Sequence, residues 1–144
     1  MIEFNFEYLG SFNEDQIKII LKKAIFVVLK ETDFKKKYYL SVLLTDNNGI
    51  KKINNKYRKI NKSTNVLSFP QNDERFVTKK TSKIILGDIV ISLEKIIKES
   101  KLQKKKFSDH LAHMAIHSLL HLLGFNHEKL EDFNIMRKKE INVL

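Results

Sequence analysis

Three histidines near the C-terminal end of the chain have the spacing of a metal site. His117 and His121 are four residues apart, so on a helix their imidazoles share one face and can reach one point. Gly124 can end that helix in a left-handed turn, which lets the chain double back and bring His127 to the same point. We therefore predict one metal ion bound by His117, His121 and His127.

Three neutral imidazoles leave a fourth coordination position open, as in catalytic rather than structural zinc sites. The metal would lower the pKa of a water bound at that position towards about 7, and it could also polarise a phosphoryl oxygen. The segment HSLLHLLGFNH has the ligand spacing of metzincin zinc proteases, but Ser118 replaces the glutamate that serves those enzymes as general base. The three metal ligands are therefore predicted to be present, whereas the general base that peptide hydrolysis needs is missing. Zinc suits three imidazoles, although copper or nickel would also bind them.

Two further histidines lie on the same helical stripe. At about 100° per residue, the directions of His110, His113, His117 and His121 span only about 80°. His113 precedes His117 by one turn, where it could orient a ligand or contact the substrate. We expect a structural role to be the commoner outcome for both His113 and the more distant His110. The alternative for the whole stripe is a chance alignment of core and surface histidines, which the third histidine and the turn glycine disfavour.

The charge balance favours a polyanionic partner. Lys and Arg total 27 against 17 acidic residues, a formal net charge of +10. Lys104 and Lys105, in the run KLQKKK, are candidate phosphate contacts, although such a run is commonly a solvated loop. The absence of cysteine excludes disulfides and thiolate metal sites. No signal peptide and no apolar run of about 20 residues is visible, so we expect a cytoplasmic protein without a membrane partner.

The hydrophobic pattern alternates between strand and helix periods. Strands are expected at residues 2–7, 38–45, 65–69 (stopping at Pro70) and 84–92 (broken at Gly87-Asp88), with a solvated connection at 79–83. Helices are expected from Ser11 or Asn13 to Lys30, from 46–48 to Arg58 with Ile50, Ile53 and Tyr57 inward, from Ser92 through Lys98, from Ser108 to near Gly124, and at 129–141. These elements predict one α+β domain over residues 1–144. Helices pack against a mixed sheet of about four strands, and the metal site lies at the end of the long helix.

Three blocks of the sequence together resemble one known family. They are Tyr57-Arg58 followed by TNVLSFP at 64–70, LGDIVIS at 86–92, and HSLLHLLGFNH at 117–127. In order and separation they are similar to the blocks of the bacterial YbeY endoribonucleases, also called rRNA maturation factors, and the length matches a whole member. The resemblance implies a metal-dependent endoribonuclease that prefers single strands. It further implies a role at the 3′ end of small-subunit rRNA and in ribosome quality control, with ribosomal RNA and the small subunit as partners.

The sequence departs from the family pattern at a few positions. Ser118 stands for the usual glycine, Phe125 for tyrosine, and Asn65 and Asn126 for aspartates. None of these changes removes a predicted metal ligand. An amide at Asn126 could weaken the orientation of a ligand, which commonly costs about 10–100-fold in affinity or activity. The departures therefore bear on the level of activity rather than its type.

The resemblance also implies roles for residues outside the histidine stripe. Arg58 matches the family arginine of the active-site cleft, where a guanidinium can bind a phosphate in two places and stabilise five-coordinate phosphorus. Thr64 and Ser68 could line an RNA groove, although turn capping explains them as well. We assign catalysis to Arg58 and His117, and no side chain is a convincing general base. A metalloprotease and a non-catalytic, metal-stabilised ribosome-assembly factor remain as rival functions.

Overall fold

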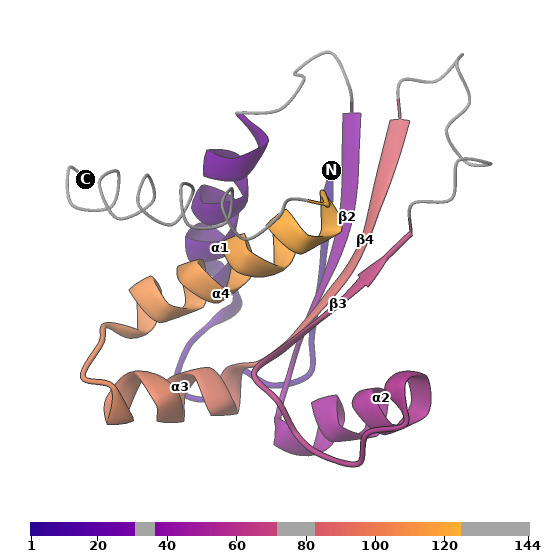
Figure 1. Cartoon of the computed structure of the whole chain (residues 1–144). Coiled ribbons are helices and arrows are strands. Elements are labelled where there is room, and N and C mark those ends of the chain that lie inside the picture. The colour runs from indigo at the N-terminus through magenta and orange to yellow at the C-terminus, as the bar shows by residue number, and fades with distance from the viewer. Residues whose placement is uncertain (31–36, 72–82, 125–144) are drawn as a thin grey trace.

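The computed structural model describes residues 1–30, 37–71 and 83–124. Within them the strands are β1 (Ile2–Phe6), β2 (Lys37–Thr45), β3 (Val66–Pro70) and β4 (Lys83–Ser92), and the helices are α1 (Glu14–Leu29), α2 (Asn47–Arg58), α3 (Leu93–Leu102) and α4 (Phe107–Leu122). The strands form one sheet in the order β1-β2-β4-β3 (Figure 1). β2 pairs in parallel with β1 and β4, and β3 pairs antiparallel with β4. The predicted α+β class with a mixed four-stranded sheet is confirmed.

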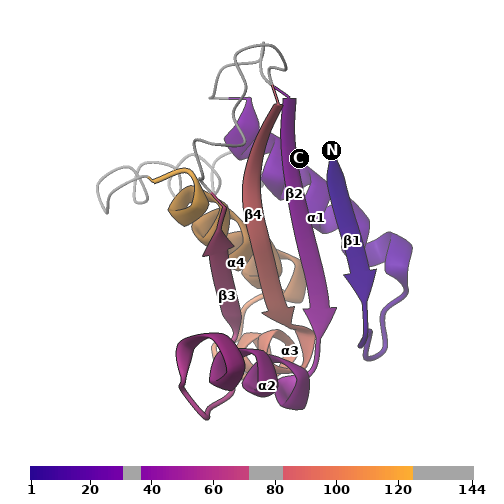
Figure 2. The ribbon, with the colours of Figure 1, turned by 90° about the vertical axis from the view of Figure 1, so that its right-hand side faces the viewer.

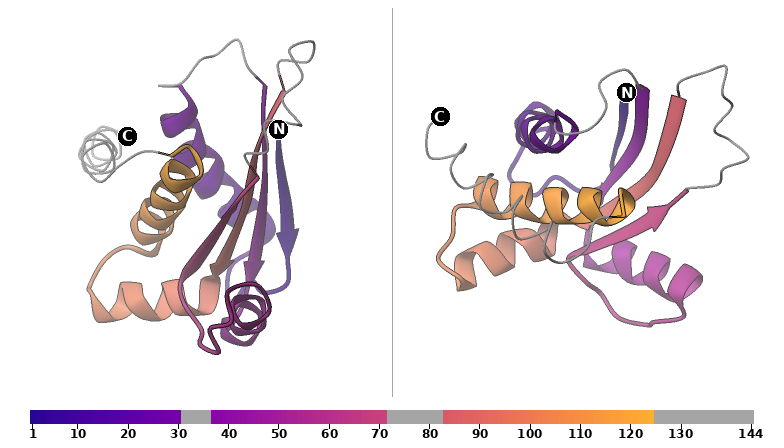
Figure 3. Two further views of the ribbon diagram at one scale, coloured as in Figure 1. Left: turned by 45° about the vertical axis from the view of Figure 1, so that its right-hand side comes forward. Right: turned by 45° about the horizontal axis from the view of Figure 1, so that its top comes forward.

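Helices α1 and α4 cover one face of the sheet, and α2 lies near one end of the other face (Figure 2). The main core forms between the sheet and these two helices, with fully buried side chains such as Leu21, Ile89 and Ile116. A smaller cluster of Ile50, Leu67 and Val90 anchors α2. Figure 3 shows α3 and α4 joined by a short connection, so that α4 runs back along the sheet. No described helix is long and apolar enough to cross a membrane.

The first two helices begin where the sequence predicts. The Asn13 side chain accepts a hydrogen bond from the Gln16 amide, and the Gln16 side chain accepts one from the Asn13 amide, both at 2.9 Å. Asp46 caps α2 by accepting from the Gly49 amide at 2.8 Å. The inward placement of Tyr57 was wrong, since its side chain is 62% exposed. The last turn of α2 extends beyond the small core that buries Ile50, and the Tyr57 ring contacts Phe69 of the edge strand at 5.6 Å between centroids.

The predicted break at Gly87-Asp88 is a β-bulge inside a continuous β4. Ile85 is paired with Tyr39 and Gly87 with Leu40, which leaves Leu86 as an extra residue. Gly87 has φ +137°, and an added Cβ would lie 2.2 Å from the Phe69 carbonyl oxygen, so only glycine fits.

The neighbouring boundaries also differ from the prediction. Pro70 belongs to β3, where an edge strand tolerates proline. Lys83 belongs to β4 rather than to the expected connection, of which 79–82 lie outside the described residues.

The two later helices keep their predicted positions but change their ends. Ser92 caps α3 by accepting from the Lys95 amide at 3.2 Å, and α3 continues past Lys98 to Leu102. Ser108 does not cap α4, because the helix begins at Phe107 with Lys106 at the cap and no side-chain hydrogen bond there. A backbone bond of 2.9 Å from the Lys105 amide to the carbonyl of Ser100 tightens the connection and starts α4 earlier. The helix expected at 129–141 lies outside the described residues.

Candidate metal centre

The last turns of α4 bring His117 and His121 together. Their Nε2 atoms are 2.9 Å apart, and their rings meet edge to face with centroids 4.5 Å apart and an interplanar angle of 82°. Two nitrogens bound to one tetrahedral zinc at about 2.0–2.1 Å would be separated by about 3.3 Å. Small side-chain rotations that widen the Nε2–Nε2 distance by a few tenths of an ångström would therefore allow both nitrogens to bind one zinc ion. The pair fits a metal ion of the predicted kind.

The third predicted ligand, His127, lies outside the described residues, so its position relative to the pair stays a prediction. Across residues 1–30, 37–71 and 83–124, no group of three His, Cys, Asp or Glu side chains could hold a metal. Gly124 follows Leu123, the C-cap residue of α4, and adopts φ +81°. The left-handed turn that the predicted return of the chain requires is thus present at the expected residue.

The four histidines of the stripe differ in burial. His110 is 5% exposed and His121 is exposed, while His113 and His117 lie between these limits. The Nε2 atom of His110 lies 3.0 Å from Oε1 of Glu99, which is the structural role expected of it. His113 lies one turn before His117 and is half-buried. The last two turns of α4 direct the imidazoles of His117 and His121 at one point.

Edge strand β3 runs beside α4 at the level of the histidine pair. The Ser68 hydroxyl donates to the Ser118 carbonyl oxygen at 3.5 Å, the long end of hydrogen bonding. Thr64 is half-buried just before the strand. Ser118 is 1% exposed, and its hydroxyl has no hydrogen-bond partner within the part of the chain that the structure describes. Because this side chain is buried, it could not reach a substrate bound by a metal at the histidine pair, so Ser118 does not replace the protease glutamate.

Arg58 ends α2 and is exposed, with no partner in the described part of the chain. The loop that leads from it to β3 is held in place by Asn54, whose side-chain amide donates to the Lys62 carbonyl at 3.0 Å. Lys95 of α3 donates to the Ser63 hydroxyl at 2.8 Å from the other side. The structure therefore places Arg58 before a fixed loop, but shows no contact between Arg58 and either histidine of the pair.

Lys104 and Lys105 lie in the connection between α3 and α4, and both are exposed. They precede α4, whereas His117 and His121 occupy its last two turns. At 1.5 Å per residue the helix separates the two groups by about 20 Å. These lysines therefore cannot contact a phosphate that a metal at the histidine pair would bind, and any contact they make with RNA would be at a distant nucleotide.

Two polar features were not predicted from the sequence as parts of a site. Glu99 of α3 meets both His110 and Asn65, whose side-chain amide donates to its two oxygens at 3.3 and 3.5 Å. No spacing rule reports such a cluster, because its members come from three elements. The second is a hollow of about 560 Å³ on the open face of the sheet, with Tyr57 and Asp88 in its lining. Asp88 accepts from the Gln71 side chain at 3.3 Å, the structural pairing that a strand carboxylate needs.

A family model described as Endoribonuclease YbeY matches residues 3–144. The chain belongs to this family of endoribonucleases. The resemblance found in the three sequence blocks is thereby confirmed. The chain is 38% identical over 139 residues to the endoribonuclease YbeY of Clostridium beijerinckii, an alignment covering 86% of this chain and 83% of that protein. It is 37% identical over 133 residues to the Bartonella quintana protein of the same name, covering 92% and 83% respectively.

The solution structure of TM1509 from Thermotoga maritima has the same fold. It superposes with a TM-score of 0.60 at 22% sequence identity, and the match covers 99% of this chain and 93% of that one. At this identity the likeness concerns the fold alone.

Proposed function

We propose that this protein is a single-strand-specific, metal-dependent endoribonuclease that processes ribosomal RNA in the cytoplasm. Its proposed substrates include the 3′ end of small-subunit rRNA, and its proposed role extends to ribosome quality control. One observation carries the proposal: in a chain of an endoribonuclease family, the Nε2 atoms of His117 and His121 lie 2.9 Å apart. The net charge of +10 supports an RNA substrate.

The proposed metal is one zinc ion held by His117, His121 and His127. Their imidazoles are neutral donors of the kind that zinc prefers, and His117 and His121 already converge. The ion would supply Lewis acidity to a phosphoryl oxygen at the scissile bond. The chain itself contributes helix α4, which carries His117 and His121 and packs against the sheet.

Arg58 is proposed to hold the scissile or the neighbouring phosphate. Its side chain is exposed and has no partner in the described residues, so a phosphate would not have to displace an ion pair within them. A guanidinium binds two phosphate oxygens at once and stabilises the charge that develops as phosphorus becomes five-coordinate. The nucleophile is a water or the ribose 2′-hydroxyl. A 5′-phosphate product supports water, and a 2′,3′-cyclic phosphate supports internal attack.

The test combines metal analysis of the purified protein with cleavage of end-labelled single-stranded and double-stranded RNA. Wild type should contain one metal ion per chain and cut the single strand, His117→Ala should lose both metal and cleavage, and Arg58→Ala should lose cleavage alone. The His117→Ala preparation also controls for contaminating ribonucleases. A wild type that cuts nothing, together with a His117→Ala protein that loses fold stability, would replace the proposal with a metal-stabilised assembly factor. Metal-dependent cleavage of casein without RNA cleavage would indicate a protease.

A further inference from the structure

An open hollow lies on the face of the sheet that α1 and α4 leave uncovered, beside helix α2 (Figure 2). Its volume of about 560 Å³ falls within the roughly 300–1,000 Å³ of sites that bind small molecules. Leu43, Ile53 and Val90 supply apolar lining from three different elements, and the rings of Tyr57 and Phe69 complete it on the side of α2 and β3. The hollow can therefore take a flat, largely apolar group.

The ring of Tyr57 is the exposed end of the apolar face of α2. Ile50, Ile53 and Tyr57 follow one another at helical spacing, and they change from fully buried through half-buried to 62% exposed. The Tyr57 ring contacts Phe69 of β3, with 5.6 Å between the centroids and 60° between the planes. It thus lines the hollow while most of its surface stays accessible, as a surface for stacking a nucleobase requires.

The charges around the hollow suit a base inside it and phosphates outside it. The side chains of Gln71 and Asp88, hydrogen-bonded at 3.3 Å, belong to its lining, and among the described residues that line it there is no Lys or Arg. Asp88 would repel a phosphate, whereas an uncharged base could bond to the amide and the carboxylate. Residues 47–62, NNGIKKINNKYRKINK, hold six Lys or Arg, all exposed, and no acidic residue. This positive charge attracts the phosphates that flank such a base.

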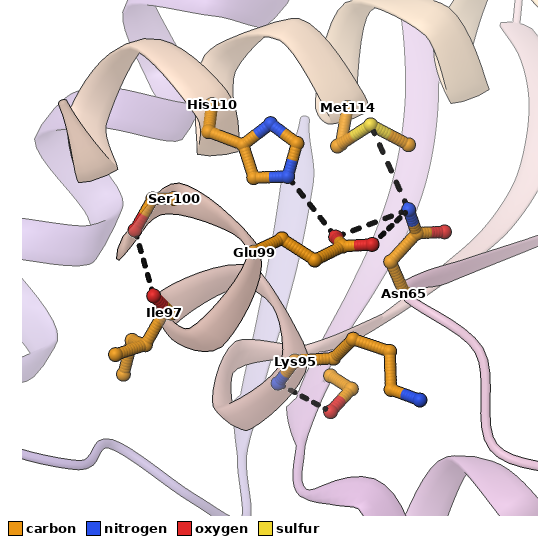
Figure 4. Close-up of polar contacts among 8 residues, drawn as sticks. Asn65, Lys95, Ile97, Glu99, Ser100, His110 and Met114 are labelled. Carbon is orange, nitrogen blue, oxygen red and sulfur yellow. Dashed lines mark hydrogen bonds and ion pairs between the residues drawn. The ribbon is translucent and has the colours of Figure 1, made fainter. Parts of the chain in front are cut away.

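A second polar cluster, at the junction of α3, α4 and the start of β3, differs because its charged group is engaged within the protein (Figure 4). The two oxygens of Glu99 accept from the Asn65 amide at 3.3 and 3.5 Å, and its Oε1 also lies 3.0 Å from Nε2 of the buried His110. That cluster joins three elements of the fold. In the hollow, by contrast, Tyr57 and Gln71 are exposed to solvent.

Edge strand β3 lies between the hollow and the histidine pair. Ser68 and Phe69 are consecutive, so their side chains point to opposite faces of the sheet. The Ser68 hydroxyl donates to the carbonyl of Ser118 on α4, next to His117, whereas Phe69 lines the hollow. Because β3 is the outermost strand on that side, a nucleic-acid strand could pass round it from the hollow to the end of α4. A base in a duplex could not enter the hollow without unpairing, so the site suits single-stranded RNA.

We propose that this hollow binds one unpaired nucleobase of the RNA substrate, stacked on Tyr57, while the positive charge of residues 47–62 attracts the adjoining phosphates. The inference rests on the proposed function, because it concerns the RNA proposed there as substrate. Tyr57 is predicted to act on the affinity for RNA and not on metal content.

The test measures binding of a short, fluorescently labelled single-stranded RNA to the full-length protein by anisotropy, at low temperature, with the RNA checked on a gel for integrity. Tyr57→Ala should bind about fivefold more weakly or worse, the lower end of what stacking on one aromatic ring contributes. Tyr57→Phe keeps the ring and should stay within about twofold of wild type. Phe26→Ala is the matched control, because Phe26 is an aromatic residue of similar exposure, 64%, but lies on α1. Its RNA affinity should also stay within about twofold.

A second readout separates stacking from charge. An abasic probe of the same length keeps the phosphates and loses the bases, so wild type should bind it more weakly than the complete RNA, and wild type and Tyr57→Ala should bind it equally. The slope of log affinity against log salt should be the same for both proteins, because Tyr57 contacts no phosphate.

Equal affinity of wild type and Tyr57→Ala for the complete RNA would overturn the inference, and so would a difference that persists on the abasic probe. A loss in Phe26→Ala as large as in Tyr57→Ala would overturn it too. If Tyr57→Ala does not fold, equal binding of both probes by wild type would do so. Wild type that binds no single-stranded RNA would overturn it in favour of a protein ligand. RNA binding that depends on Tyr57, in a protein that cuts no RNA, would support the inference while refuting the proposed nuclease function.

Discussion

The two ends of α4 carry histidines in opposite surroundings. Near its start, His110 is buried and its Nε2 is bonded to the Glu99 carboxylate at 3.0 Å. In its last two turns, His117 and His121 are more accessible, and their Nε2 atoms are 2.9 Å from each other. All three residues are histidines on one face of α4, so neither residue type nor helical face explains why their surroundings differ. Burial and the identity of the nearest polar group decide which histidine stabilises the fold and which can bind a metal.

The surrounding elements create this difference. Helix α3 lies along the first half of α4 and supplies Glu99, whereas the second half reaches the edge strand β3 (Figure 1). A histidine under α3 meets a carboxylate and is removed from solvent. A histidine beside an edge strand keeps an exposed side.

The largest effect is expected from His117→Ala or His121→Ala. Loss of a ligand should lower the rate of RNA cleavage by about a thousandfold or more, since ligand-orienting groups alone commonly contribute 10–100-fold. The unfolding free energy of the metal-free protein should change by no more than about 1 kcal/mol, because both side chains are partly or fully exposed. Denaturant unfolding in the presence of a chelator measures the second quantity. A large destabilisation with cleavage retained would reverse the contrast between the two ends of α4.

Next in size is Arg58→Ala. Removing a group that stabilises charge in the transition state commonly lowers kcat by about 10²–10³. Metal content and stability should match wild type, because Arg58 is exposed and has no partner in the described residues. Lys56→Ala, in the same last turn of α2, is the control. Because a lysine keeps the charge but cannot bind two phosphate oxygens in a fork, Arg58→Lys should restore little activity. Equal losses in Arg58→Ala and Lys56→Ala would mean that general charge, not a bidentate guanidinium, is required.

His110→Ala should show the converse pattern to His117→Ala. It removes a buried, charge-assisted hydrogen bond and leaves a cavity, so the metal-free protein should lose about 2–3 kcal/mol of unfolding free energy. Urea unfolding of the chelator-treated protein gives the value. An unchanged midpoint would show that the bond to Glu99 is not structural.

The smallest effect is expected from the double variant Lys104→Gln/Lys105→Gln. These residues lie about 20 Å from the histidine pair, so kcat at saturating RNA should be unchanged. If both contact phosphates, the slope of log affinity against log salt should fall by about 1.4 in magnitude, at about 0.7 per contact on a single strand. A salt series of RNA-binding measurements would show this. An unchanged slope would leave the two lysines as a solvated loop.

Much of this fold follows from the sequence because local rules act within single elements. Asn13 and Asp46 cap their helices by bonding to residues three positions ahead, and a sequence shows such pairs directly. Gly87 was misjudged as a break, since a bulge depends on the register with β2 and on the nearby Phe69 carbonyl. Tyr57 has the helical period of a core residue, and only the extent of the neighbouring core shows that it is exposed.

The candidate site divides in the same way. Residues four apart on a helix meet wherever the helix lies, so the convergence of His117 and His121 could be predicted. The contacts of His110 could not, because Glu99 and Asn65 come from other elements and their distance depends on tertiary packing. The buried position of Ser118 likewise depends on which side of α4 faces β3. Sequence spacing therefore predicts the histidine pair, and only the structure identifies the partner of His110 and the burial of Ser118.

We propose that the histidine pair holds the metal with which this protein cuts RNA. This is tested most directly by adding Zn²⁺ stepwise to chelator-stripped wild type and His117→Ala protein while measuring cleavage of a single-stranded RNA. Wild-type activity should return in proportion to bound zinc and reach its maximum at about one ion per chain, with none returning in His117→Ala. Full cleavage by the metal-free His117→Ala protein would contradict it.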